Sequence, residues 1–401
     1  MSRKSLVLVM VFGWGAAAAS TEAAMSQWPG FGWLANPALL SSPDIGAWEI
    51  WLAQGDIAVR NNAFNLDMYR TYNGTFLDAD DKERILDSIS GKSARGLLRG
   101  EGGAVGVHVG RAAFLTKAYV GGDLTVDKDL IDLMFFGNDI DRRYELLSSG
   151  GMLAYVSMGG AFGFPTGQVA GWETSTGIGA RIAIGGLAAK IEESSIEILT
   201  QVEGLTATGA TVIRRTKDSD GAGRPATVAF DLGGRAAKGP WEVAIALKDV
   251  GPSFSWSDVE EKVIEFEALE WTAEMGDSGY TTVDTTYDVG SWSTPLPTRL
   301  ECTAARSLSW GAAYARWEQG LRRWAGVTTT PRVHAGVAWD ALSWLCPWLE
   351  LGIGSPEGFG LSVGAALRPG PVRLDLGVTG FRLPPSHSEA LGVQLGLGFG
   401  G

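Results

Sequence analysis

Residues 391–399 read LGVQLGLGF, and this short stretch decides the fold class. Apolar side chains stand at every odd position from Leu391 to Phe399, and glycine or Gln394 stands at every even one. Because successive side chains of a β-strand point to opposite faces, the stretch has one apolar face and one small or polar face. Over about 10 residues this pattern is typical of a membrane-spanning strand, with lipid on one side and a polar lumen on the other.

The same alternation recurs along the chain. It is clear in residues 241–248 (WEVAIALK), 299–304 (RLECTA) and 372–379 (VRLDLGVT). A soluble β-sandwich shows the same alternation, with its apolar face in a core. The long series of strands, and the frequent Gly and Ala on the second face, favour a barrel instead. The sequence therefore predicts an all-β chain that forms a transmembrane antiparallel β-barrel.

Turn residues divide the chain into strands and two short helices. Asp78 or Asp80 can cap a helix that runs to about residue 88, and its acidic first turn suits the helix dipole. A second helix is expected over 127–136, ended by Gly137. The sequence contains more candidate strands than a barrel needs, so some of them are expected in loops. They are predicted at about 46–59, 103–109, 112–121, 150–163, 175–190, 194–204, 208–216, 225–233, 240–249, 261–271, 279–288, 297–305, 308–318, 331–340, 346–354, 359–367, 371–380 and 390–400.

The N-terminus reads as a secretory signal peptide. Arg3 and Lys4 form a short positive region, and the apolar run from Leu6 to Trp14 is shorter than the roughly 20 residues of a spanning helix. Small residues around 16–23 offer cleavage sites, so residues 1–24 are predicted to be removed. The alternative is a true membrane anchor. With a signal peptide the mature chain leaves the cytoplasm, and we expect it in the cell outer membrane.

Composition narrows the function classes. The 401 residues include 56 Gly and 16 Trp. Glycine allows bends and close packing inside barrels, and tryptophan favours the membrane–water interface. The net charge of −12 argues against binding to nucleic acid. With only Cys302 and Cys346 a disulfide framework is excluded, although a single bridge between them stays open.

No sequence motif indicates catalysis, and we predict that the protein is not an enzyme, with no catalytic, cofactor-binding or metal site. His108, His334 and His387 lack partners at metal-ligand spacing, and a solvated place in the lumen or at the interface is expected for the first two. The stretch 218–221 (DSDG) resembles half of a calcium loop without its closing Glu, which favours a polar turn. An acidic patch is expected to be a solvated face rather than a catalytic carboxylate pair. It comprises Glu260, Glu261, Glu265, Glu267, Glu270 and Glu274.

Several segments resemble FadL-type outer-membrane barrels, in particular the TraF-like and PorV-like branch and its uncharacterised relatives. Asn36-Pro37-Ala38 follows shortly after the expected mature N-terminus. The resemblance extends over most of the mature chain, and one departure is that Phe399 is followed by two glycines, whereas such strands usually end on an aromatic residue. Residues 81–89 resemble the family's first helix, 126–138 its second helix, 230–233 with 243–251 its mid-barrel hairpin, and 296–300 the start of its terminal strand series.

The resemblance implies a barrel of about 14 strands with an N-terminal plug in its lumen. Residues 25–45 would form the plug, with Asn36, Pro37 and Ala38 as its motif, and residues 46–401 the barrel. From the residues alone, Pro37 restricts Asn36 to extended or turn conformations. An ordered irregular segment is therefore expected there, and a plain turn before the first strand is the alternative.

Two functions follow from the resemblance. A FadL-type barrel would be a passive conduit for hydrophobic or amphipathic small molecules, along a lateral or lumenal path. A PorV-like barrel would be a scaffold or assembly factor for secreted or surface proteins. A conduit needs a continuous apolar pocket beside the plug, whereas a scaffold needs large ordered extracellular loops. The expected partners are outer-membrane lipid and either a hydrophobic small molecule or a secreted or surface protein. Nucleic acid is not an expected partner, and no cofactor is expected.

Overall fold

The computed structural model describes residues 36–43, 45–217, 224–272, 280–339, 342, 344–354, 358–381 and 390–400. The expected signal peptide, residues 25–35 of the expected plug, the 218–221 turn, Glu274 and His387 lie outside these residues. Among the described residues, no helix is both long enough and apolar enough to cross a bilayer.

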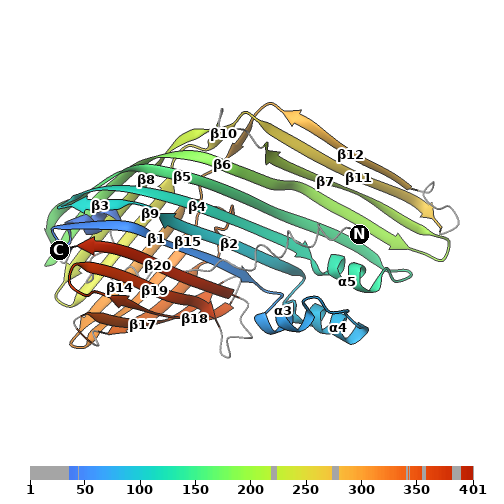
Figure 1. Ribbon diagram of the computed structural model, residues 1–401. Coiled ribbons are helices and arrows are strands. Elements are labelled where there is room, and N and C mark those ends of the chain that lie inside the picture. The colour runs from blue at the N-terminus through green and yellow to red at the C-terminus, as the bar shows by residue number, and fades with distance from the viewer. Residues whose placement is uncertain are drawn as a thin grey trace.

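The chain forms a closed 14-stranded antiparallel barrel, as the resemblance implied (Figure 1). The first strand pairs with the last, so the wall of the barrel is closed: Gly55 lies opposite Leu395 and Ile57 opposite Val393. In order around the barrel, the strands are β1 (Trp48–Asn61), β2 (Ser93–Gly103) continued by β3 (Gly106–Val109), β4 (Ala112–Asp127), β5 (Arg143–Val169), β6 (Trp172–Thr200), β8 (Ala226–Lys238), β9 (Trp241–Val250), β14 (Arg299–Leu308), β15 (Gly311–Gly320), β16 (Arg332–Trp339), β17 (Leu345–Gly354), β18 (Gly358–Leu367), β19 (Val372–Phe381) and β20 (Ala390–Gly400).

The alternation along β20 has the orientation that its sequence predicts. Leu391 and Leu395 are exposed on the outer surface, whereas Gln394 is 3% exposed and faces the lumen. A closed sheet satisfies every backbone hydrogen bond between its strands, so it can span a bilayer with apolar side chains outward. This is the architecture of an outer-membrane protein, and the predicted localisation follows from it.

The two ends of the barrel differ in their connections. Turns of two to five residues join strands at the end where β1 begins and β20 finishes; in the two-residue turn between β5 and β6, Ala170 and Gly171 have φ of 52° and 79°. Such left-handed turns match the twist of paired strands. Long connections with helices lie at the other end. Outer-membrane barrels have short periplasmic turns and longer extracellular loops, so we take the second end as extracellular.

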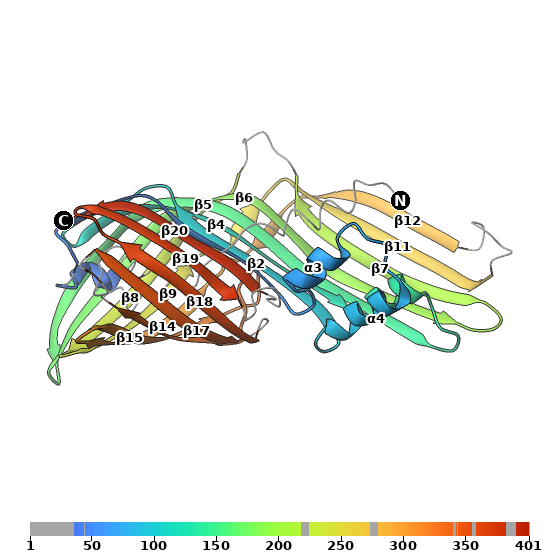
Figure 2. The same cartoon turned by 60° about the horizontal axis from the view of Figure 1, so that its bottom comes forward.

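Two strands continue far beyond the extracellular rim. β5 has 27 residues and β6 has 29, and their outer halves carry a sheet that leaves the barrel (Figures 1 and 2). β7 (Leu205–Thr216) pairs with β6, β11 (Val259–Trp271) with β7, and β12 (Tyr280–Val289) with β11. A separate ribbon pairs β10 (Phe254–Trp256) with β13 (Trp292–Thr294). We call the β7, β11 and β12 part, with the ends of β5 and β6, the extracellular sheet.

Three short helices lie among the extracellular connections, where two were predicted: α3 (Leu66–Tyr72), α4 (Ala79–Ser88) and α5 (Lys128–Phe136). The predicted cap of α4 is present, because Asp78 accepts from the Asp81 N–H while the Asp81 side chain accepts from the Asp78 N–H. The unpredicted α3 has only seven residues, begins at an Asn65 cap and buries none of its side chains. A helix this short lacks a recognisable apolar period.

The sheet departs from the predicted strands at two places. Residues 175–190 and 194–204 are not two strands but parts of β6, which shifts register against β7 between Ile191 and Glu193. A β-bulge accommodates the extra residue where the polar sequence suggested a turn. Residues 93–102 of β2 were missed altogether. The charged Arg99 and Glu101 face the lumen, and Gly100 leaves the outward face between them without an apolar side chain, so the usual alternation is hidden.

Candidate functional site: the lumen of the barrel

The N-terminal segment, residues 36–43, lies inside the barrel at its periplasmic end. Its short 3-10 helix, η2 (Pro37–Ser41), contacts β5, β6 and β8. Asn36 is buried and extended, as the following proline requires. The Asn36 side-chain oxygen accepts from the Ala38 N–H at 3.0 Å, and its amide nitrogen donates to the carbonyl of Ile245 at 3.1 Å. The expected motif residues therefore tie the segment both to itself and to the wall.

Three glycines of the wall make room for the segment, and we call Gly163, Gly177 and Gly233 the glycine cradle. A Cβ at Gly177 would lie 2.2 Å from the carbonyl carbon of Pro37, and one at Gly233 would lie 2.0 Å from Asn36 Oδ1. Neither position tolerates a side chain while the segment is docked. Close backbone approach of this kind is a reason for glycine inside a strand.

Apolar packing holds the rest of the segment. Leu39 and Leu40 are buried against Trp51 of β1 and Leu115 of β4. The Ser175 hydroxyl also donates to the Ala38 carbonyl at 3.0 Å. The segment thus fills part of the lumen with both polar and apolar contacts.

Above the segment, buried charges cross the lumen. Asp249 is fully buried and forms ion pairs with Arg181 at 2.9 Å and with Lys117 at 2.8 Å. Arg181 also grips Asp231 at 2.7 Å, and Asp231 in turn accepts from the Asp249 N–H at 2.9 Å. Paired carboxylates and guanidinium groups with several hydrogen bonds are the arrangement in which buried charge is tolerated.

The same set of ion pairs connects opposite parts of the wall. Arg299 of β14 binds Glu101 of β2 at 2.5 Å and Glu301 at 3.0 Å. Lys248 binds Glu301 at 2.8 Å, and Arg99 binds Glu318 of β15. We call this set the charged layer; it comprises Arg99, Glu101, Lys117, Arg181, Asp231, Lys248, Asp249, Arg299, Glu301 and Glu318.

Aromatic side chains lie on the extracellular side of the charged layer. Phe254, Trp256 and Trp292 come from the β10–β13 ribbon and pack with Tyr119, Tyr155 and Trp324; we call these six the aromatic cluster. The rings of Tyr119 and Tyr155 are stacked with centroids 5.2 Å apart. The Tyr155 hydroxyl donates to Asp249 at 3.0 Å and links the cluster to the charged layer. Buried tyrosines usually find such a partner for the hydroxyl.

The inward row of β4 passes through all three levels in order. Leu115 touches the N-terminal segment, Lys117 belongs to the charged layer, and Tyr119 belongs to the aromatic cluster. One strand thus positions three different environments, because alternate residues of a strand face the same side.

The expectation for two histidines requires correction, and the structure also shows the surroundings of the acidic patch and of the two cysteines. His108 and His334 are buried, not solvated: His108 is fully buried 3.7 Å from Glu49, and His334 is bonded to Glu350 at 2.9 Å. In the acidic patch, Glu260 and Glu261 are paired with Arg215 and Arg214 on β7. Cys302 and Cys346 are both free thiols. Within the described part of the chain, no three His, Cys, Asp or Glu side chains gather as a metal site would require.

The charged layer and the glycine cradle were not identified from sequence. Glu101 and Arg299 are 198 residues apart, and only strand order brings them together. The sequence signal that could have indicated the layer is the charged residue on the inward face of successive strands, such as Glu301 in RLECTA.

Comparisons with known proteins give full-length likenesses to solved barrels. No protein-family model and no curated protein sequence matches the chain. A Pseudomonas aeruginosa FadL homologue is 12% identical with a TM-score of 0.49, covering 96% of this chain and 99% of that chain. The Ralstonia pickettii toluene transporter TbuX is 10% identical with a TM-score of 0.47 (97% and 96% covered). The P. putida toluene transporter TodX is 12% identical with a TM-score of 0.47 (93% and 94% covered).

Proposed function

We propose that the protein is a passive conduit for small hydrophobic or amphipathic molecules across the outer membrane. The observation that carries the proposal is the aromatic cluster, buried inside the extracellular half of a closed barrel. Aromatic and apolar side chains that exclude water are the lining expected for hydrophobic ligands. A lumen that passed only water and ions would be lined by polar side chains instead.

The straight path through the lumen is obstructed below the cluster. The charged layer joins β2 to β14, and the N-terminal segment fills the periplasmic end. Passage of a hydrophobic molecule between these charges is unfavourable in free energy, because it would separate buried charged groups from their partners. Such a molecule would pass only if the charged layer rearranged. We infer that the N-terminal segment acts as the plug of the barrel.

A sideways path is favoured by an irregularity in the wall. β1 shifts register against β20 at Leu52, and β2 and β3 are separated by Ala104 and Val105 on the neighbouring strand. Thr116 of β4 closes this break, because its hydroxyl accepts from the N–H groups of Ala104 and Val105 at 3.2 and 3.0 Å. Leu52 and Val105 are exposed on the lipid side. The break lies between the levels of Leu115 and Lys117, so a molecule from the aromatic cluster would reach the membrane here once the charged layer has rearranged at Lys117.

Uptake into outer-membrane vesicles tests the proposal. Vesicles that carry the protein should take up a labelled small aromatic hydrocarbon several-fold faster than vesicles without it. Phe254→Ser should reduce the rate, because it places a hydroxyl in the aromatic cluster. Trp310→Ala is the matched control, since Trp310 is exposed at the periplasmic turn between β14 and β15. Equal uptake with and without folded protein would contradict a conduit.

A second candidate is a scaffold for a secreted or surface protein. The ordered extracellular sheet favours it, because β12 pairs with β11 on one side and presents its other edge within the described residues. Exposed edges accept an added strand from a partner. Two results together would favour the scaffold over the conduit. Vesicles with and without the protein would take up the hydrocarbon at the same rate, and a surface protein bound in stoichiometric amount would be lost when β11–β12 is deleted.

A further inference from the structure

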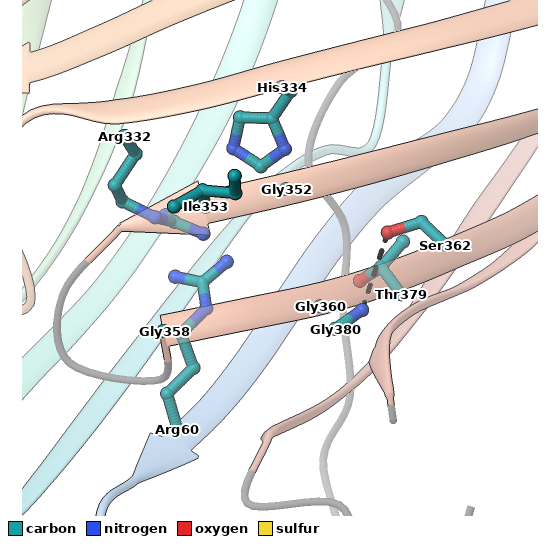
Figure 3. A pocket seen from close by; sticks show the side chains of 10 residues that line it. All are labelled: Arg60, Arg332, His334, Gly352, Ile353, Gly358, Gly360, Ser362, Thr379 and Gly380. Atoms are coloured by element: carbon teal, nitrogen blue, oxygen red, sulfur yellow. Dashed lines mark hydrogen bonds between the residues drawn. The ribbon is translucent and has the colours of Figure 1, made fainter. Parts of the chain in front are cut away.

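A small pocket lies in the lumen near the extracellular rim, on the wall formed by β1 and β16 to β19. It encloses about 330 Å³ of empty space including its open side. Its lining is mostly polar, and its one large apolar residue, Ile353, has a side chain that is 65% exposed on the outer face of β17. The lining residues are Arg60, Arg332, His334, Gly352, Ile353, Gly358, Gly360, Ser362, Thr379 and Gly380 (Figure 3).

Two guanidinium groups converge on this pocket from different parts of the wall. Arg332 is the first residue of β16 and Arg60 the last but one of β1, and their guanidinium groups lie toward one another in Figure 3. Both side chains are buried. A guanidinium carries five N–H donors in a fixed fork, so one that bonds to the protein keeps donors for a ligand.

His334 supplies a third group of matching chemistry. It is 5% exposed, and its Nδ1 is bonded to Glu350 at 2.9 Å, which fixes the ring. Its Nε2 is buried, has no hydrogen-bond partner in the described part of the chain, and belongs to a ring that lines the pocket. A buried polar atom without a partner is costly, so a ligand atom there would be favourable. An oxyanion in the pocket would add the negative charge that favours the doubly protonated ring, and Nε2 would then donate to it.

Hydroxyl groups and glycines complete the pocket. Ser362 and Thr379 present hydroxyl groups on β18 and β19, and Ser362 also accepts from the Gly380 N–H at 3.3 Å. A Cβ at Gly352 would lie 2.9 Å from His334 Nδ1, so glycine keeps the space beside the ring open. Guanidinium, imidazole and hydroxyl groups can donate hydrogen bonds, and the oxygens of a carboxylate, sulfate or phosphate accept them.

We propose that this pocket binds one compact oxyanion, with Arg60 and Arg332 gripping it from two sides and His334 and the hydroxyl groups completing its shell. The small polar lining fits the oxyanion and leaves no apolar slot for a chain. The site is separate from the aromatic cluster and does not depend on what crosses the barrel.

Titration calorimetry of the folded, detergent-solubilised barrel tests the site. Inorganic sulfate is the probe because its charge is constant at working pH. The wild type should bind sulfate saturably, and Arg332→Gln and Arg60→Gln should each weaken binding about tenfold or more, since each removes charge-assisted hydrogen bonds. Arg332→Lys keeps the charge without the fork and should give an intermediate loss. Arg143→Gln is the matched control, because Arg143 is exposed on the extracellular sheet beside Glu197.

The outcomes separate the site from general attraction and from loss of fold. Each variant must first show the compact electrophoretic band of a folded barrel. Absence of saturable binding in the folded wild type would overturn the proposal, and so would equal weakening by Arg143→Gln. Octyl sulfate, below its micelle concentration, distinguishes the source of the oxyanion. Binding that depends on Arg332 and competes with inorganic sulfate supports the site and extends it to amphiphile headgroups, whereas binding indifferent to Arg332 counts against it.

Discussion

At the scale of single residues, the lumen depends on charges that only their partners make tolerable. Arg181 is 1% exposed and bonds Asp231, Asp249 and the Ser157 hydroxyl. Removing one member of such a set leaves the others charged and buried, which is far more costly than losing an exposed pair. The charged layer therefore has a structural role whatever crosses the barrel.

Arg181→Met is expected to lower the free energy of unfolding by about 3–5 kcal/mol, because Asp249 and Asp231 lose their shared cation. Arg143→Met is the control: its pair with Glu197 is solvent-exposed, and about 0–1 kcal/mol is expected. Urea unfolding in lipid vesicles, followed by tryptophan fluorescence, measures both. A similarly small decrease in the free energy of unfolding of both variants would show that the charges of the layer do not depend on one another.

At the scale of elements, the N-terminal segment packs directly against the backbone of β6, because Gly177 has no side chain. Gly177 and Gly179 both face the lumen on the same strand, but only Gly177 touches the segment. At Gly179 the nearest atoms to an added Cβ are 3.6 Å away, which is ordinary contact. The two glycines thus allow a matched comparison of the proposed plug.

Gly177→Ala is expected to displace the N-terminal segment and raise single-channel conductance in planar bilayers, as deletion of residues 26–44 should. Gly179→Ala should leave conductance at the wild-type level, since the added methyl group meets no backbone. If the deletion and Gly177→Ala both conduct like the wild type, the segment does not close the barrel and is only packed within it.

At the scale of the whole molecule, the membrane selects which face of each strand is apolar. Leu391 and Leu395 are both on the outer face of β20, the first near the extracellular rim and the second nearer mid-strand. Gln394 lies on the inward face of the same strand. Because it is buried in the lumen, an arginine there would overpack the interior, and two outward positions make the better comparison.

Leu395→Arg is expected to destabilise the inserted barrel by about 2–4 kcal/mol, the cost of an arginine near the bilayer midplane. Leu391→Arg should cost about 0–1 kcal/mol, as is found near the interface. Reversible folding into phospholipid vesicles gives both values. Equal costs at the two depths would show that β20 does not cross the bilayer at the assumed tilt.

Fractionation provides a simpler test at the same scale. The protein should appear in the outer membrane and should migrate faster unboiled than boiled, because a closed barrel resists detergent unfolding. A soluble periplasmic protein with unchanged mobility would contradict both the localisation and the lipid-facing assignment.

Features that depend on neighbouring residues were predictable from the sequence. The alternation in LGVQLGLGF predicted an outward and an inward face, and Asp78 predicted the start of α4. In each case the signal lies within about ten residues, because strand periodicity and helix capping are local properties. Fold class and most strands followed from them, although the function did not.

Features that depend on closure were decided only by the tertiary structure. Glu101 meets Arg299, Asn36 meets the carbonyl of Ile245, and Arg60 meets the β16–β19 wall because β1 closes against β20. The sequence alone determined which side chains face inward; it did not determine which of them meet. That choice follows from strand order and stagger around the barrel, which bring together residues such as Arg99 and Glu318, 219 positions apart along the chain.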